Sequence, residues 1–283
     1  MAKKSTGNSN PLVIVLLCIV LVQFGIIISL LVKQKKEAIP IEPLELVEES
    51  YPEIEIEKEV LAKVALVIDD WGYNRRNIPY LEKLDVPLTL SILPSLIYSK
   101  EIASFAKGHM REAILHLPLE PRSLPEGAEL EPDTILTTMG KDEIFKILNK
   151  DLKSLPMVVG VSNHMGSKAT ASEPLMRIIF EELARRNLFF LDSLVISRPV
   201  SRKIAKDLGV GYITRDIFLD NEQDYEYISN QFEKLIRLAK KKGKAVGIGH
   251  DRKLTLRVLD DKISQLDSGK QQIEFVLLSE LVE

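Results

Sequence analysis

Residues 65–72 read ALVIDDWG, a short apolar run that ends in two adjacent carboxylates, Asp69 and Asp70. A short apolar run that ends in polar residues predicts a buried β-strand, because both faces of a parallel strand are covered in an α/β fold. The two carboxylates then lie where the strand leaves the core. Burying either one unpaired costs several kcal/mol, so the pair requires partners or a function.

Seven similar apolar runs follow along the chain. They lie at 88–95, 113–118, 157–164, 188–193, 210–216, 245–251 and 273–279. Segments in which apolar residues recur with helical spacing lie between these runs, at about 74–84, 97–107, 141–154, 172–187, 198–208 and 228–239. Alternating strands and helices indicate the α/β class. Seven or eight such units favour a closed (β/α) barrel, with an open doubly wound sheet as the alternative.

The amino-terminal region predicts an uncleaved signal anchor over residues 1–36. Residues 12–32 carry no formal charge, and about 20 apolar residues span a bilayer as a helix. The run continues directly into Lys33 without a small-residue cleavage site. Lysines flank both ends, so the charges do not set the orientation. Cys18, the only cysteine, lies inside the predicted transmembrane helix and has no disulfide partner.

Residues 37–61 are expected to form an acidic stalk. Nine glutamates, one lysine and three prolines occupy positions 37–59, a composition typical of an extended, solvated spacer. The last part, PEIEIEKEV, alternates with period two and leaves an added edge strand as an alternative. The folded domain then covers residues 62–283.

The charge balance argues against nucleic acid as a partner. The chain has a net charge of -3 and a pI near 6.0, and residues 60–283 carry equal numbers of acidic and basic side chains. A nucleic-acid-binding domain normally has a basic face or a basic stripe.

Polar side chains gather at the carboxyl ends of the predicted strands, where both architectures place ligand sites. These residues are Asp69, Asp70, His116, Asn163, His164, Asp192, Arg215, Asp216 and His250. A single Asp in such a place often caps a helix or turn, and His109, which precedes a strand, is expected to be structural. However, His, His and Asp on strands about 4.8 Å apart can reach one point. Three such ligands with one open position are the pattern of catalytic zinc.

Several segments, taken in order, resemble one known family. VIDDWGYN, LHLPLEP, SNHMGSKAT, LDSLVIS, TRDIFLD and GIGH look like the divergent polysaccharide deacetylases, a distant branch of the carbohydrate esterase deacetylases with a distorted (β/α) barrel. The resemblance covers residues 62–282. It implies that Asp69 is the catalytic base, that Asp70 binds a divalent metal, expected to be zinc, and that His250 is the general acid.

The remaining site residues follow from departures from that family. Its metal motif has two histidines four positions apart, whereas this chain has His116 followed by Glu120. We expect His164 to supply the second histidine, with Glu120 as the alternative ligand. The residues expected to position substrate are Glu120, Asn163, Ser167, Asp192, Arg215 and Asp216. The family's arginine-proline-aromatic segment is not visible, which leaves Arg215 as one candidate partner of the base.

The predicted function is a metal-dependent hydrolase that removes N-acetyl groups from an envelope polysaccharide or a peptidoglycan-like glycan. The predicted location is the cell membrane, with the domain on the extracytoplasmic side. One alternative is a catalytically silent, membrane-tethered barrel that binds glycan or a cell-wall enzyme. Another is a metal-dependent hydrolase of esters or phosphates. Trp71 and Tyr73 either stack on a sugar ring or anchor a loop.

Overall fold

The computed structural model describes residues 11–34, 61–109, 111–124, 126–266 and 272–282. The chain divides into two compact units, Met1–Glu57 and Lys58–Glu283. Apart from residue 61, the predicted stalk and its alternative edge strand lie outside the described residues. The domain boundaries given above therefore stay a prediction.

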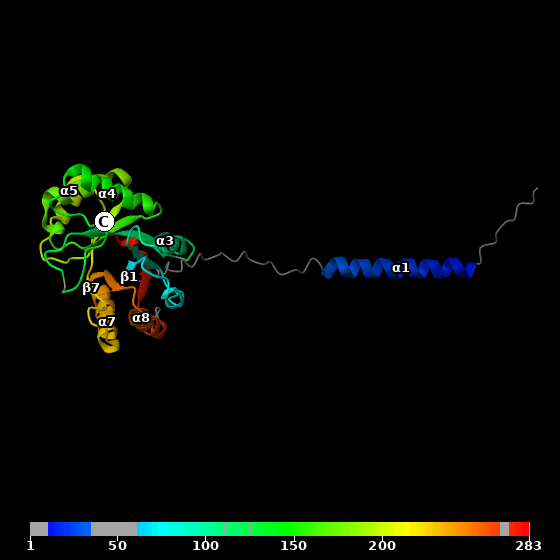
Figure 1. Cartoon of the computed structure of the whole chain (residues 1–283). Helices are drawn as coiled ribbons and strands as arrows, with labels where there is room; N and C mark the ends of the chain where they lie inside the picture. The colour runs from blue at the N-terminus through cyan, green and yellow to red at the C-terminus, as the bar shows by residue number, and fades with distance from the viewer. Residues whose placement is uncertain (1–10, 35–60, 110, 125, 267–271, 283) are drawn as a thin grey trace, which may run out of the picture. The chain divides into compact units, whose positions relative to one another are not determined.

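In the first unit, the described residues form the helix α1 (Pro11–Gln34), which includes the predicted transmembrane helix at residues 12–32 (Figure 1). Its described apolar side chains are exposed, from 49% at Ile28 to 64% at Leu21. A search confined to the described residues finds no helix long and apolar enough to cross a membrane. The prediction of a transmembrane helix is therefore not confirmed.

The second unit contains one curled sheet. Its strands are β1 (Ala62–Trp71), β2 (Leu88–Ile92), β3 (Arg111–Leu119), β4 (Gly160–Met165), β5 (Phe189–Asp192), β6 (Tyr212–Thr214), β7 (Ile217–Phe218), β8 (Lys244–His250) and β9 (Ile273–Val276). The strand order is β6-β5-β4-β3-β2-β1-β8-β7, and β9 pairs with the first half of β1. All of these pairs are parallel. The predicted α/β class is confirmed.

The sheet curls into an incomplete barrel. Strands β6 and β7 lie at the two ends of the strand order, yet only Arg215 and Asp216 separate them in the chain. This short connection holds the two edges near each other. In the part of the chain that the structure describes, no ladder joins β6 to β7, so the barrel is open along this seam. The predicted curvature is correct, whereas the predicted full closure is wrong.

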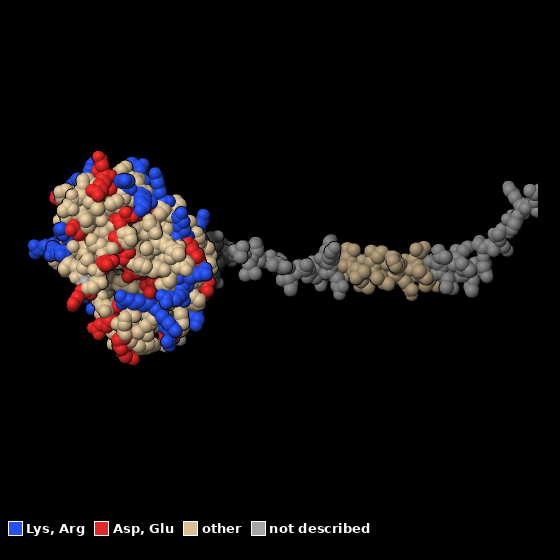
Figure 2. All heavy atoms as spheres, viewed as in Figure 1, with Lys and Arg blue, Asp and Glu red and all other residues tan. Residues whose placement is uncertain are grey.

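Helices cover the outer face of the sheet. They are α2 (Ile78–Leu81), α3 (Ser99–Lys107), α4 (Lys141–Ser154), α5 (Glu173–Arg186), α6 (Ser201–Leu208), α7 (Tyr225–Lys242) and α8 (Lys253–Gln265), with short 3-10 turns η1 (Ala169–Ala171) and η2 (Leu278–Leu281). Figure 1 shows α4 beside α5, and α7 and α8 in a second group. The predicted helix at 74–84 shortens to α2, and α8 was not predicted. Acidic and basic side chains are interspersed over the visible face of this unit (Figure 2).

Both faces of the strands are apolar, which explains the continuous apolar runs in the sequence. On β1, Leu66 and Ile68 belong to the outer core beneath the helices, whereas Ala65 and Val67 belong to a second cluster inside the barrel. Leu278 of η2 joins that inner cluster, and its N–H donates to the hydroxyl of Thr89 on β2. The carboxyl-terminal segment thus fills the amino-terminal end of the barrel, and the opposite end is left for a site.

One buried carboxylate in the outer core has no partner. Asp151 on α4 is fully buried, and neither of its carboxylate oxygens accepts a hydrogen bond from any described residue. Burial raises the pKa of Asp151 to about 7, and the carboxylate of Asp133 adds to the shift. The folded chain therefore holds a proton here at pH values where the unfolded chain has lost it.

The stability of the domain should therefore fall as pH rises. Between the ordinary Asp value of 3.8 and about 7, only the folded state binds this proton, which corresponds to a loss of up to about 4 kcal/mol. Asp151→Asn should flatten this dependence and stabilise the domain at pH 8 by about 2 kcal/mol, since the amide still lacks partners. Urea unfolding at pH 4.5 and pH 8 measures both effects.

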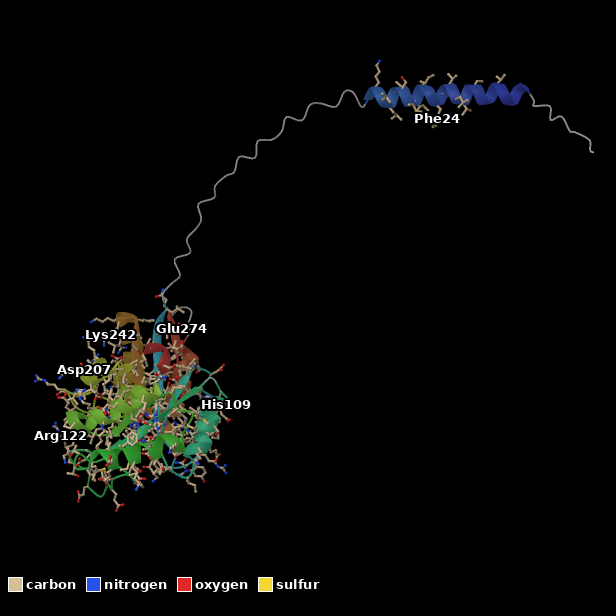
Figure 3. All side chains as sticks on the ribbon, turned by 90° about the horizontal axis from the view of Figure 1, so that it is seen from above. Phe24, His109, Arg122, Asp207, Lys242 and Glu274 are labelled. Carbon is tan, nitrogen blue, oxygen red and sulfur yellow. The ribbon has the colours of Figure 1, made fainter. Side chains whose placement is uncertain are left out.

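Asp207→Asn on α6 is the matched control, because its carboxylate is 44% exposed and lies at the periphery (Figure 3). Its effect on the free energy of unfolding should stay within about 0.5 kcal/mol at either pH. Equal pH dependence in the Asp151→Asn variant and the unsubstituted chain would show that Asp151 is not the group responsible.

Candidate metal and catalytic site

An irregularity at the end of β1 directs two adjacent carboxylates to one site. The register between β1 and β2 shifts between Ile68 and Trp71, and Asp70 has a positive φ of 66°. In a regular strand, neighbouring side chains point to opposite faces, and a bulge is what re-aims one of them. Asp tolerates the left-handed conformation better than most residues. The local backbone therefore allows Asp69 and Asp70 to face the same histidines.

Three side chains from three strands converge at this end of the barrel. The Oδ1 atom of Asp70 lies 3.3 Å from Nε2 of His116 on β3 and 3.1 Å from Nδ1 of His164 on β4. One ligand atom from each of the three lies within 4.8 Å of the others. The predicted triplet of one aspartate and two histidines is thus brought together.

This group fits a divalent metal. Tetrahedral zinc with ligand bonds of about 2.0–2.1 Å sets its ligand atoms roughly 3.3 Å apart, close to the spacings around Asp70. Burial alone would raise the pKa of Asp70, but hydrogen bonds from His116 and His164 outweigh burial and hold this pKa far below its usual range. Asp70 is therefore an anion, as a metal ligand must be.

Asp69 differs from its neighbour in its environment. It is 2% exposed, its Oδ2 lies 3.7 Å from Nε2 of His116, and its Oδ1 accepts no hydrogen bond from the described residues. Burial is the main cause that raises the pKa of Asp69, and the histidines His116 and His250 oppose it. Two adjacent carboxylates with pKa values shifted in opposite directions can hold different roles, one as a ligand and one as a proton acceptor.

His250 faces this pair from the neighbouring strand. Asp69 and His250 are register partners on β1 and β8. The Nδ1 atom of His250 lies 2.7 Å from Oδ1 of Asp220, a fully buried carboxylate that also accepts bonds from the His250 backbone N–H and the Thr255 hydroxyl. Burial lowers the pKa of His250, but Asp220 outweighs burial and raises it. The protonated imidazole that a general acid needs is therefore favoured.

Sequence reasoning assigned no role to Asp220. The signal was available in TRDIFLD, where Asp220 follows three apolar residues, the first two of which form the short strand β7. A strand of two residues is too short to show a period, so the position of Asp220 beside His250 emerges only from the pairing of β7 with β8.

Asp220→Asn should lower the pKa of His250 by removing the charge that raises it. The basic limb of the pH profile of any reaction that uses His250 as its acid then moves to lower pH by about one unit, since the acid form is lost earlier. Steady-state rates from pH 5 to 9 measure the shift. A loss of rate that is equal at all pH values would contradict this role and indicate damage to the fold instead.

Glu120 and Ser167 lie in neighbouring loops and are engaged by other groups. Glu120 accepts hydrogen bonds from the Thr137 backbone N–H and hydroxyl, and forms an ion pair of 2.6 Å with Lys168. Although burial acts in the opposite direction, these partners lower the pKa of Glu120 to about 2. The hydroxyl of Ser167 accepts a bond from the N–H of Arg122. Glu120 is not in the three-residue group, which favours His164 over Glu120 as a ligand.

Asn163, Asp192 and Arg215 join the strand ends to one another. The Asn163 side chain accepts from the N–H of Ser193. Asp192 accepts from the N–H of Leu194 and from the Tyr212 hydroxyl. These bonds shape the loop after β5.

The predicted pairing of Arg215 with the base is not seen. Its guanidinium donates to the carbonyls of Ser193 and Leu194 and stacks over Phe218 at 3.7 Å from the ring centre. Asp69 nevertheless raises the pKa of Arg215 through its charge, while burial is the larger effect and lowers it. The interaction with Asp69 is therefore electrostatic and not a direct ion pair.

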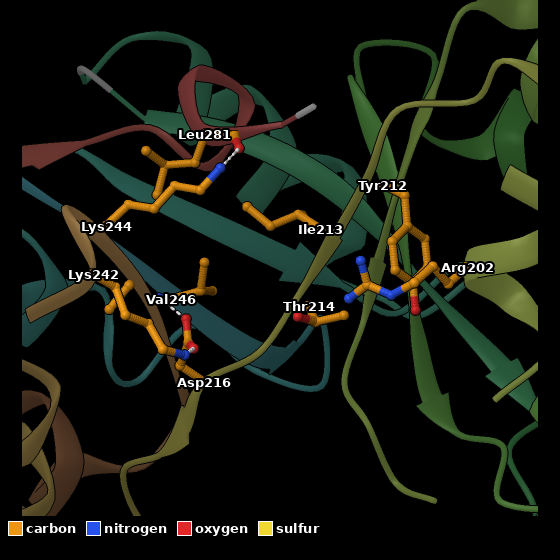
Figure 4. A pocket seen from close by; sticks show the side chains of 10 residues that line it. Arg202, Tyr212, Ile213, Thr214, Asp216, Lys242, Lys244, Val246 and Leu281 are labelled. Atoms are coloured by element: carbon orange, nitrogen blue, oxygen red, sulfur yellow. Dashed lines mark hydrogen bonds and ion pairs between the residues drawn. The ribbon is translucent and has the colours of Figure 1, made fainter. Parts of the chain in front are cut away.

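Asp216 bonds groups beside the open seam between β6 and β7. Its Oδ1 lies 2.9 Å from Nζ of Lys242, and its Oδ2 accepts from the N–H of Val246. Figure 4 shows this pair at the wall of a cavity of about 270 Å³ that Arg202 also lines. The carboxylate replaces a missing ladder bond at the edge of β8, so its contacts are structural and give no support to a role in positioning substrate.

Three further side chains can now be placed. His109 bonds the carbonyl of Phe105 through Nδ1 and lies at the periphery, as expected for a structural residue (Figure 3). Trp71 is fully buried, so it cannot stack on a sugar ring. Tyr73 is 47% exposed and its hydroxyl bonds Glu131, an arrangement that links two loops.

Comparisons with known proteins agree with this geometry. A sequence model of the family described as divergent polysaccharide deacetylase matches residues 66–282. YibQ of Escherichia coli (strain K12) is 35% identical over 204 residues, which are 72% of this chain and 63% of YibQ. A protein of Haemophilus influenzae is 32% identical over 212 residues, or 75% of each chain. This chain thus spans less than two thirds of the length of YibQ.

A solved structure shows the same fold. The crystal structure of ATU2773 from Agrobacterium tumefaciens C58 superposes with a TM-score of 0.72 at 24% identity, and the match covers 78% of this chain and 89% of that one. The family match itself includes every strand from β2 to β9 and most of β1. This chain belongs to the divergent polysaccharide deacetylase family.

Proposed function

We propose that this protein is a metal-dependent hydrolase that removes N-acetyl groups from an envelope polysaccharide or a peptidoglycan-like glycan. The observation that carries the proposal is the pair of facing groups at one end of the barrel. Asp70, His116 and His164 offer a metal site beside Asp69, and His250 with Asp220 faces Asp69 from the next strand. The family match supports the substrate class.

The residues divide the chemistry of amide hydrolysis between them. A divalent cation, such as zinc, bound by Asp70, His116 and His164 supplies Lewis-acid polarisation of the carbonyl and lowers the pKa of water. Asp69 accepts the proton of the attacking water, for which its unpartnered Oδ1 is available. His250 donates its proton to the departing amine, and Asp220 holds the imidazole in place and stabilises its charge.

A catalytically silent, glycan-binding barrel is the second candidate, and one observation favours it. Asp70 lies 3.3 Å from His116 and 3.1 Å from His164, so this triplet can also serve as a structural network. This candidate predicts that the chain binds glycan, binds no metal and releases no acetate from the glycan.

Release of acetate tests the proposed activity. The purified full chain, incubated with zinc, should release acetate from N-acetylglucosamine oligomers or peptidoglycan fragments, and a chelator should abolish the release. The rate should return when the metal is restored. Tight binding of zinc with no acetate from any of these glycans would overturn the deacetylase proposal, and binding of glycan without metal would support the silent barrel.

The cellular location is also a proposal. A glycan of the cell envelope lies outside the cytoplasm, so we propose that the folded domain acts at the cell membrane on its extracytoplasmic side. A phosphatase that is active only outside the cytoplasm, fused to the carboxyl terminus, should be active in intact cells. A fluorescent reporter that folds only in the cytoplasm is the matched fusion, and its fluorescence would contradict the proposal.

A further inference from the structure

Two buried hydroxyl groups lie beneath the metal site and belong to none of the roles described above. Ser91 is on β2 and Ser162 is on β4, and both are fully buried. Their Oγ atoms are 2.7 Å apart. Strand β3 lies between β2 and β4 in the sheet, so the two hydroxyls meet inside the barrel beside His116.

These hydroxyls support one member of the site. Ser162 lies 2.8 Å from Nδ1 of His116, the ring nitrogen that faces away from Asp70. Ser91 in turn is the hydrogen-bond partner of Ser162. The connected groups are therefore Ser91, Ser162 and His116, all of them 3% exposed or less.

The directions of the hydrogen bonds follow from the role of His116. A histidine that binds metal through Nε2 must carry its hydrogen on Nδ1 and donate it to a partner. Ser162 accepts that hydrogen, and a hydroxyl has only one hydrogen of its own to donate. Ser162 therefore donates its hydrogen to Ser91.

We propose that Ser162, with Ser91 behind it, is a positioning residue that fixes the ring orientation and tautomer of His116. The inference rests on the proposed metal site and deepens it. Through these two hydroxyls, the ligand His116 is held from its buried side by one network that joins β2, β3 and β4.

A purely structural explanation makes different predictions. Small polar residues in a tight core can be retained for their volume alone, in which case the loss of the hydroxyl matters little for metal. The structure provides a matched residue for this explanation. Ser201 is equally buried, and its hydroxyl has no partner among the described residues. Ser201→Ala removes the same oxygen from the core without touching the site.

Zinc affinity of the full chain and ¹⁵N NMR of its histidine side chains test the proposal without requiring activity. In the zinc-loaded chain, Nδ1 of His116 should carry the hydrogen. Ser162→Ala should remove the acceptor of that hydrogen and weaken zinc binding by about 10- to 100-fold. Ser162→Thr keeps the hydroxyl and should restore the affinity to within about 3-fold, and Ser201→Ala should leave the affinity within about 2-fold of the starting value.

Ser91→Ala separates the two ends of the network. The Ser162–His116 bond remains and only the partner of Ser162 is lost, so the affinity for zinc should fall by no more than about 3-fold. Unchanged zinc affinity in Ser162→Ala, or a loss equal to that in Ser201→Ala, would overturn the inference. Absence of zinc binding in the unsubstituted chain would instead overturn the proposed metal site.

Discussion

Asp70→Asn should abolish metal binding at the site, with a loss of zinc affinity of at least about 100-fold. Structural zinc sites with four ligands bind with roughly 10–16 kcal/mol, so each ligand contributes about 3 kcal/mol, which is a factor of about 100. The true loss should be larger, because Asp70 is the only negatively charged member of the triplet and contacts both histidines. Competition with a chromophoric chelator measures the affinity.

The neighbouring carboxylate of Asp251 supplies the control. Asp251 follows His250, the register partner of Asp69 on β8. Its backbone N–H donates to the carbonyl of Asp69, and its side chain accepts from the amide of Asn77. Asp251→Asn removes a nearby negative charge but no ligand, so zinc affinity should stay within about 5-fold. If both variants lose zinc equally, general electrostatics rather than ligation would explain the effect.

The strands of the barrel were predictable because burial on both faces leaves a direct trace in the sequence. Every apolar run from ALVIDD to IEFVLLS overlaps a strand of the sheet. The run at 210–216 contains β6, and the short strand β7 lies just beyond it. The ligands were predictable for the same reason, since Asp70, His116 and His164 follow or interrupt such runs. Parallel strands align their ends, so position in the run determines position in the site.

The parts that were missed depend on local backbone geometry and on pairing between distant segments. Strict alternation along β1 places Asp70 on the face opposite Asp69, and only the shifted register and the positive φ of Asp70 allow both to contact His116. Asp220 reaches His250 because β7 pairs with β8. Arg215 and Asp216 occupy the connection that spans the open seam, where Arg215 donates to the carbonyl of Ser193 and Asp216 accepts from the N–H of Val246.

Asp69→Asn should reduce acetate release by about 10²- to 10⁴-fold, the range expected for the loss of a general base. Zinc affinity should remain within about 5-fold, because Asn keeps the size of the side chain and Asp69 is not in the ligand triplet. This combination, metal retained and turnover lost, distinguishes Asp69 from Asp70, whose substitution should remove both. It also separates the two candidate functions. If the unsubstituted chain and Asp69→Asn bind glycan equally well and neither releases acetate, the site is used for recognition. If only the unsubstituted chain turns over, Asp69 is the group that accepts the proton.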